Sequence, residues 1–294
     1  MLHRINRAIE LLASEQPIYY VGGHTGHVLT HAQGVQDAKT WADYINVGME
    51  HGAFDMAGLD EYMRGLVDGG PTSSGHRTPT VIVELPVDGS HEMVVRYNAW
   101  QCRQILARGV HGVLLCQAES ADAVRAFVES CRYPLNTIGV GRGLGRGTRG
   151  RGSEASAARV WGVSPEEYID RADPWPLNPQ RELLLGVKIE SLEGVPNVEQ
   201  ILSVPGLGFA EMGPGDLGLA LGSKQVPREP YPPDMQEARE RVFETCRTRG
   251  IAFLETCTPE NITRKIDEGV RVIAGHREET ARVGHTHTKR AMPV

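Results

Sequence analysis

The fold is decided by residues 80–116, which read TVIVELPVDGSHEMVVRYNAWQCRQILARGVHGVLLC. Two largely apolar runs of strand length, Thr80–Leu85 and Gly112–Cys116, enclose a helical pattern over His91–Ala107. Apolar runs without alternation are typical of strands that are buried on both faces. The stretch therefore predicts one strand–helix–strand unit of a parallel sheet.

The same alternation continues along nearly the whole chain. The candidate strands are Ile18–Val21, Tyr44–Gly48, Thr80–Leu85, Gly112–Cys116, Thr137–Val140, Leu183–Ile189, Gly208–Met212, Ile251–Leu254 and Arg271–Ala274. The helical stretches between them are Met56–Val67, His91–Ala107, Ala121–Cys131, Asn197–Leu202, Met235–Arg249 and Pro259–Glu268. About eight strand–helix repeats predict an α/β fold, a (β/α)8 TIM barrel of roughly 250 residues with terminal extensions.

We expect a single domain over residues 1–294, with a barrel core from about 18 to 275 and a C-terminal arm over 276–294. A doubly wound open sheet is the alternative, because it also alternates strands and helices. No Gly-x-Gly-x-x-Gly motif opens the first helix, which argues against the dinucleotide-binding version of that alternative.

Composition and charge exclude several classes of protein. Of the 294 residues, 40% are hydrophobic and 23% charged, as in ordinary folded proteins. Lys and Arg number 31 against 37 Asp and Glu, a net charge of −6, so we expect no nucleic-acid binding. We expect no membrane span or signal peptide, because the chain lacks an apolar run of ~18–20 residues and Met1–Arg7 leads into an amphipathic stretch. Five widely spaced cysteines without a Cys-x-x-Cys pair indicate reduced thiols and a cytoplasmic location.

Two carboxylates follow neighbouring predicted strands. Glu190 comes directly after Leu183–Ile189, and Asp216 follows the next strand within Gly213-Pro214-Gly215-Asp216. In a barrel both lie at the end where chemistry gathers. Such a pair suits one hard divalent cation, which takes oxygen ligands. The alternative is that both residues only cap helices.

The segment Val187-Lys188-Ile189-Glu190-Ser191, with Gly213–Leu217 after it, resembles the HpcH/HpaI aldolases, a family of metal-dependent class II pyruvate aldolases. The resemblance spans about residues 40 to 275. It includes three weaker stretches, which are Met49-Glu50-His51-Gly52, Cys131-Arg132-Tyr133-Pro134 and Thr258-Pro259-Glu260. It implies a (β/α)8 barrel, in agreement with the strand pattern.

The resemblance also implies roles for individual residues. Glu190 and Asp216 match the family's two metal ligands, which usually hold Mg²⁺ or Mn²⁺. The metal chelates a 2-oxo acid and, as a Lewis acid, stabilises its enolate. The backbone of Gly213–Gly215, which includes Pro214, approaches the substrate carboxylate. His51 matches the family's acid/base histidine, and its alternative role is that of a structural histidine.

Two positions depart from the family pattern. Gly48 stands where an aspartate is usual, three residues before the histidine. Glu84 stands where the family places an arginine that stabilises an oxyanion, and a carboxylate has the wrong charge for that role. Either an arginine such as Arg142 or Arg149 supplies the charge, or the reaction differs. Glu84 is then a candidate acid/base or metal-shell group.

Arg142 belongs to an unusual segment, Gly139–Gly152, which contains seven glycines and four arginines. We expect it to bind a substrate carboxylate, because arginine matches carboxylates bidentately. A flexible solvated loop is the alternative. An RGG-like nucleic-acid segment is disfavoured, because the segment has no phenylalanine or tyrosine.

Lys188 shares one strand face with Glu190 and is a candidate substrate-binding residue. Glutamine is common at this position in the family. We expect Lys188 to stay protonated against Glu190; the alternative is a Schiff base with the ketone, as in class I aldolases.

Histidines gather near both ends of the chain. We expect His24, His27 and His31 on the loop after the first strand, facing the substrate; a zinc site is the alternative. Near the other end the segment Arg282–Arg290 is basic. Because the family commonly forms hexamers through its C-terminal region, we expect a homo-oligomer, either hexamer or trimer.

The leading interpretation is a lyase that cleaves a 4-hydroxy-2-oxo acid to pyruvate, or a related 2-oxo acid, and an aldehyde. One alternative is a relative that uses the metal enolate for another condensation or a decarboxylation. Another is a catalytically silent barrel that binds a 2-oxo acid or a partner protein.

Overall fold

The computed structural model describes residues 4–275 and 277–293, so Met1–His3, His276 and Val294 of the expected terminal segments lie outside the described residues. The strands are β1 Ile18–Gly23, β2 Tyr44–Gly48, β3 Thr80–Asp88, β4 Gly112–Cys116, β5 Pro174–Trp175, β6 Leu183–Ile189, β7 Phe209–Met212, β8 Ala252–Thr256 and β9 Val270–Ala274. The helices are α1 Arg7–Ala13, α2 His31–Asp37, α3 Met56–Gly69, α4 Glu92–Leu106, α5 Ala121–Cys131, α6 Glu154–Trp161, α7 Pro165–Arg171, the 3-10 turn Val195–Asn197, α8 Val198–Ile201, α9 Pro214–Ala220, α10 Pro233–Arg249, α11 Ile262–Glu268 and α12 Glu278–Thr288. In this part of the chain, no helix combines the length and the apolar character needed to cross a membrane.

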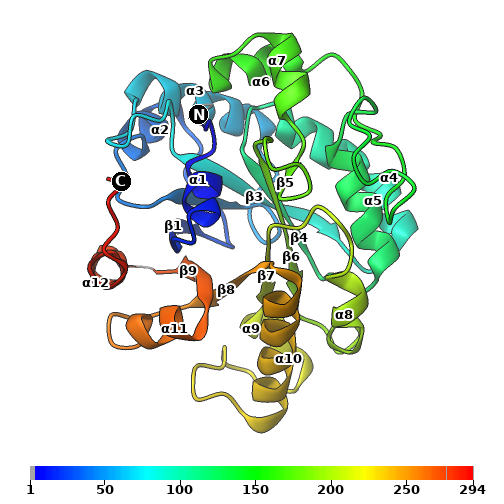
Figure 1. The fold of residues 1–294 in the computed structure, drawn as a ribbon, viewed down its shortest axis with the longest axis vertical. Coiled ribbons are helices and arrows are strands. Elements are labelled where there is room, and N and C mark those ends of the chain that lie inside the picture. The colour runs from blue at the N-terminus through cyan, green and yellow to red at the C-terminus, as the bar shows by residue number, and fades with distance from the viewer. Residues whose placement is uncertain (1–3, 276, 294) are drawn as a thin grey trace.

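Eight parallel strands close into a barrel. Their order is β4-β3-β2-β1-β9-β8-β7-β6, and a further pairing between β4 and β6 completes the ring. The two-residue β5 lies beside β6 outside that ring. The helices surround the strands (Figure 1). The predicted (β/α)8 barrel is confirmed, and the open-sheet alternative is wrong because an open sheet would leave two unpaired edges.

One predicted strand is wrong. Thr137–Val140 forms turns, and its one sheet-like contact is an isolated bridge between Val140 and Leu144. The cause is the glycine spacing, because Gly139 and Gly141 have φ angles of 84° and 74°. Such left-handed backbone interrupts an extended strand.

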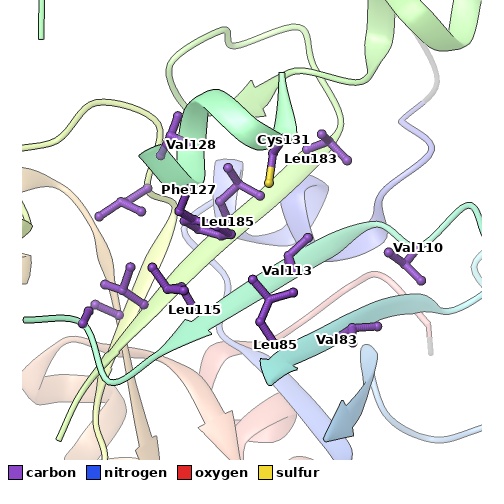
Figure 2. Packing of buried hydrophobic residues seen from close by; sticks show 14 of the residues in the cluster. Val83, Leu85, Val110, Val113, Leu115, Phe127, Val128, Cys131, Leu183 and Leu185 are labelled. Carbon is purple, nitrogen blue, oxygen red and sulfur yellow. The ribbon is translucent and has the colours of Figure 1, made fainter. Parts of the chain in front are cut away.

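A hydrophobic layer lies between the strands and the outer helices. Figure 2 shows Leu115 of β4 and Leu185 of β6 beside Phe127 and Val128 of α5. All four side chains are buried. Because side chains alternate along a strand, the residues between these outward-facing ones point into the barrel.

The barrel interior changes from apolar to polar along the strands. Its apolar layer includes Tyr44, Ile82 and Phe209. Two residues further along the same strands come Asn46, Glu84 and Glu211, which are also buried. On β6, Lys188 takes the corresponding place, opposite Glu211 in the register. The strand period therefore puts a buried polar layer at the carboxyl ends of the strands.

Helix α1 covers the other end of the barrel (Figure 1). Its Ile9 and Leu11 belong to the interior apolar cluster. Asn6, which caps the helix, donates from Nδ2 to the carbonyl oxygens of His111 and Glu182 at 3.1 and 3.0 Å. This end is therefore closed by main-chain contacts, and the polar end remains for a ligand.

The C-terminal arm folds back onto the barrel. Tyr19 of β1 packs edge-on against His285 of α12, with ring centroids 4.8 Å apart. Beyond the helix, Arg290 donates to both carboxylate oxygens of Asp43, at 2.5 and 2.7 Å. The predicted role of this arm in oligomer formation stays a prediction.

Candidate active site

A cavity of about 300 Å³ lies at the carboxyl ends of the strands. It is lined by Tyr20, His24, His51, Lys188, Glu190, Glu211, Gly213, Pro214, Gly215, Asp216, Val226 and Thr256. Eight of the nine residues predicted for the site are therefore here or directly beneath it, since Glu84 bonds to His24 and Lys188. The ninth, Arg142, is not among them.

Lys188 is the one lysine or arginine among these lining residues. Its Nζ lies 2.5 Å from Oε2 of Glu50 and 3.5 Å from Oε2 of Glu84. These two carboxylates are therefore its ion-pair partners, whereas Glu190 is the partner predicted from the sequence. Burial alone lowers the pKa of Lys188, but Cys116 and the surrounding carboxylates outweigh it and raise the pKa. The side chain is thus a fixed ammonium, which does not favour the neutral amine that a Schiff base requires.

Glu190 and Asp216 are linked by Gln117. The backbone N–H of Gln117 donates to Oε1 of Glu190 at 3.0 Å, and its side-chain Nε2 donates to Oδ2 of Asp216 at 3.3 Å. Gln117 has a φ of 48°, in the left-handed region of backbone conformation that residues other than glycine rarely adopt. Such backbone strain is typical of functional sites. Sequence reasoning missed Gln117, although it directly follows a predicted strand.

These residues fit a divalent cation. Burial raises the pKa of Glu190 to about 8, against the opposing charge of Lys188, so the carboxylate lacks a full counter-charge. A Cβ at Gly213 would lie 2.2 Å from Oε2 of Glu190, so glycine keeps that oxygen's position open. The donors are carboxylate oxygens, which Mg²⁺ and Mn²⁺ prefer.

His51 stands on the Asp216 side of the cavity. Its Nε2 lies 3.7 Å from Oδ2 of Asp216 and 3.6 Å from Oε2 of Glu50, too far for hydrogen bonds. Ligand atoms of these three residues all lie within 4.8 Å of one another, whereas Glu190 is outside that group. His51 is 48% exposed and free to meet a substrate.

Glu84 is held from three sides. Its Oε1 lies 2.7 Å from Nδ2 of Asn46, which donates to it, and 2.7 Å from Nδ1 of His24. Its Oε2 faces Lys188. Burial opposes ionisation, but the hydrogen bond with His24 and the charge of Lys188 outweigh it and lower the pKa of Glu84.

Of the three histidines expected to face the substrate, His24 lines the cavity. His27 instead bonds to Asp37 at 2.8 Å, and His31 at the start of α2 bonds to Asp68 at 2.8 Å. The predicted loop position is thus right for His24 and His27, whereas His31 begins α2, and of the three His24 faces the cavity. The zinc alternative is not supported, because the three imidazoles have separate carboxylate partners.

The arginine-rich segment does not reach the cavity. Helix α5 runs back to the end where the strands begin, and Gly143 of the segment lies against Pro205, shortly before β7. Arg142 is exposed in this loop. Arg149 is buried, with its guanidinium 4.6 Å from the Tyr133 ring and 5.1 Å from the Tyr168 ring. The prediction that this loop binds the substrate carboxylate is therefore wrong, because α5 leads the chain to the opposite end of the barrel.

Glu211 is a buried acid that the sequence reasoning did not single out. Burial raises its pKa to about 7, although Lys188 opposes the shift. Its Oε2 has no hydrogen-bond partner among the described residues. The sequence feature that could have identified Glu211 is its position as a charged residue within the apolar run Gly208–Met212, two positions after Phe209.

A second cavity of about 790 Å³ adjoins the first and shares Pro214, Val226 and Thr256 with it. Arg228 and Arg277 also line this second cavity. It offers room for the part of a substrate that extends beyond the carboxylate cluster.

The family model for HpcH/HpaI aldolase/citrate lyase matches residues 77–275. A hydroxypyruvate/pyruvate aldolase of Pseudomonas aeruginosa is 30% identical over 228 residues, which are 78% of this chain and 71% of the relative. A 4-hydroxy-2-oxo-heptane-1,7-dioate aldolase of Shigella sonnei is 28% identical over 191 residues, 64% of each chain.

The fold is also similar to a solved structure. The crystal structure of an HpcH/HpaI aldolase/citrate lyase family protein from Burkholderia cenocepacia matches with a TM-score of 0.70 and 19% identity, over 97% of both chains. At that identity the likeness concerns the fold alone. Since the family model covers more than half of the sequence, this chain belongs to the HpcH/HpaI aldolase/citrate lyase family.

Proposed function

We propose that this chain is a lyase, a class II aldolase that cleaves or forms a 4-hydroxy-2-oxo acid from pyruvate or a related 2-oxo acid and an aldehyde. The observation that carries the proposal is the cluster of Glu190, Asp216 and Gly213 beside a buried ammonium at the carboxyl end of the barrel. The two relatives described above, which are named as aldolases of 2-oxo acids, support it.

Glu190 and Asp216 would hold Mg²⁺ or Mn²⁺. The bound cation supplies a Lewis acid that polarises the ketone of the 2-oxo acid. The backbone of Gly213–Gly215 receives the substrate carboxylate, because the space beside Gly215 is open to at least 4 Å from a Cβ position. The ammonium of Lys188 balances the negative charge of the substrate.

His51 is the group that removes the proton of the substrate hydroxyl during cleavage. Its exposed imidazole stands beside Asp216, so it can reach an oxygen of a substrate held there. Neutral imidazole is a suitable base near neutral pH. The aldehyde half then occupies the larger adjoining cavity.

The test is exchange of the pyruvate methyl protons with D₂O, followed by NMR on metal-stripped protein with and without Mn²⁺ or Mg²⁺. We expect exchange only with metal, and its loss in Asp216→Asn. The matched control is Asp122→Asn, an exposed aspartate on α5 that pairs with Arg125. Full exchange without metal, or in Asp216→Asn, would contradict the assignment. Product analysis with 4-hydroxy-2-oxo acids separates cleavage from decarboxylation.

Two further predictions complete the proposal. The chain forms a homo-oligomer, and an exposed apolar stripe on α4, formed by Met93, Tyr97 and Trp100, is available for it. The protein works in the cytoplasm, where its five buried free cysteines would stay reduced. Light scattering after size-exclusion chromatography measures the oligomer directly.

A further inference from the structure

A second histidine reaches the cavity with a carboxylate behind it. His24 follows β1, and its Nδ1 lies 2.7 Å from Oε1 of Glu84 on β3. The Glu84 side chain is almost completely buried, whereas 40% of the His24 side chain is exposed. A hydrogen bond therefore runs from a ring at the cavity wall to an acid inside the barrel.

This bond determines which nitrogen of His24 faces the substrate. An ionised carboxylate only accepts hydrogen bonds, so Nδ1 carries the proton and donates it to Glu84. Nε2 is then the nitrogen that is left for the cavity, and it has no hydrogen-bond partner among the described residues. The same arrangement fixes the tautomer and the ring orientation in catalytic triads.

Glu84 is itself fixed in place. Asn46 donates to Oε1 at 2.7 Å, and the ammonium of Lys188 lies 3.5 Å from Oε2. The charged groups that act on His24 are thus Glu84, Glu211 and Lys188. The hydrogen bond with Glu84 raises the pKa of His24, although burial opposes it, and so favours the protonated ring, which can donate from Nε2.

The two histidines of the cavity differ in how they are held. His51 makes no hydrogen bond shorter than 3.5 Å to Glu50 or Asp216 and stands on the side of the metal-binding carboxylates. His24 has a fixed orientation and stands on the side of Glu84 and Lys188. Proton transfer depends on a group held within reach of the reacting atom and in a suitable direction, and the hydrogen bond with Glu84 gives His24 such a fixed direction.

We propose that His24 and Glu84 form a dyad that transfers the proton at C3 of the 2-oxo acid, with His24 as the catalytic residue and Glu84 as its positioning residue. This rests on the proposed aldolase function. In cleavage, His51 takes the hydroxyl proton, the C3–C4 bond breaks and its electron pair stays on C3 as the enolate. The protonated ring of His24 then donates the proton of Nε2 to C3, which completes the 2-oxo acid and leaves the neutral Nδ1–H tautomer. Solvent returns a proton to His24 and removes one from His51.

The experiment separates the two histidines. His24→Gln should slow metal-dependent methyl exchange of pyruvate by about 100-fold or more, the usual loss for a general acid or base. His51→Gln should reduce cleavage of 4-hydroxy-2-oxo acids more strongly than it reduces exchange, whereas His24→Gln should affect exchange directly. The matched control is His31→Gln, because His31 makes a similar bond of 2.8 Å to a carboxylate, that of Asp68, outside the cavity. If the exchange rate of His24→Gln stays within about threefold of the rate of the parent protein, the proposed dyad is wrong.

Two readouts test the positioning by Glu84. In metal-free protein, ¹⁵N NMR of the imidazoles should give His24 as the Nδ1–H tautomer, and an Nε2–H tautomer would refute the arrangement. Glu84→Gln should lower the pKa of His24, because the hydrogen bond and the charge of Glu84 raise that pKa, and so move the pH profile of exchange to lower pH. An unmoved profile would contradict the coupling. Absence of exchange in the parent protein with metal, for pyruvate and for related 2-oxo acids alike, would instead refute the proposed function.

Discussion

Replacing Lys188 with methionine removes the ammonium that stands between Glu50 and Glu84 and keeps the length of the side chain. The 2.5 and 3.5 Å contacts disappear, and the buried carboxylates lose their common counter-charge. Breaking a buried ion pair by removing one partner costs about 3–5 kcal/mol. For 294 residues the entropy of unfolding is about 0.6 kcal/mol per degree, so the melting temperature should fall by roughly 5–8 °C.

Differential scanning calorimetry measures this fall, and the double variant Lys188→Met/Glu84→Gln shows its cause. If the loss comes from an uncompensated carboxylate, neutralising Glu84 should restore part of the melting temperature, with an interaction free energy of about 0.5–3 kcal/mol in the double-mutant cycle. Lys265→Met is the matched control: Lys265 is equally buried and pairs with Glu229 and Glu255 at 2.8 and 2.9 Å. It should lower the melting temperature without abolishing pyruvate exchange. A Lys188→Met protein that melts within about 1 °C of the parent would refute the reasoning.

The metal site and the opposite end of the barrel offer three more tests. Gly213→Ala should weaken Mn²⁺ binding by about 10- to 100-fold, because the new Cβ would stand 2.2 Å from Oε2 of Glu190; titration calorimetry measures the affinity. Mn²⁺ affinity should fall about tenfold per unit as the pH drops below about 8, because the cation must displace a proton from Glu190, whose pKa is raised; a Kd that is constant from pH 6 to 8 would contradict this. Asp173→Asn should cost about 3–5 kcal/mol in urea unfolding and leave the KM for pyruvate unchanged, because its buried partner Arg132 lies far from the cavity.

The fold could be predicted from the sequence because strands that are buried on both faces appear in it as uninterrupted apolar runs. Every barrel strand coincides with an apolar run such as Leu183–Ile189. The false strand Thr137–Val140 shows the limit, because its apolar residues alternate with glycines whose φ angles are positive. Helix α1 was not predicted, although Asn6, whose side chain accepts from the N–H of Ile9, is a local capping signal. The place of the helix over the barrel depends on contacts of Asn6 with residues more than 100 positions away.

The candidate site was predictable only where its residues follow strands. Glu190, Asp216 and His51 come together as the order of the strands requires. The contacts of Lys188 with Glu50 and Glu84 depend on the register in which the barrel closes, which no local pattern encodes. The position of Arg142 was missed for a different reason. The direction of a helix determines at which end of the barrel the next loop begins, and here α5 leads to the end opposite the cavity.

Closure of the barrel also has a consequence for synthesis. The first strand, β1, forms part of its hydrogen-bonded edge with the last, β9, through pairs such as Tyr19 with Ile273. At about 5–20 residues per second, a ribosome needs roughly 13–50 s to travel from one to the other. During that interval β1 has an open edge, which is a template for pairing with other chains. Nascent chains of this protein should therefore depend on a chaperone until β9 has left the ribosome.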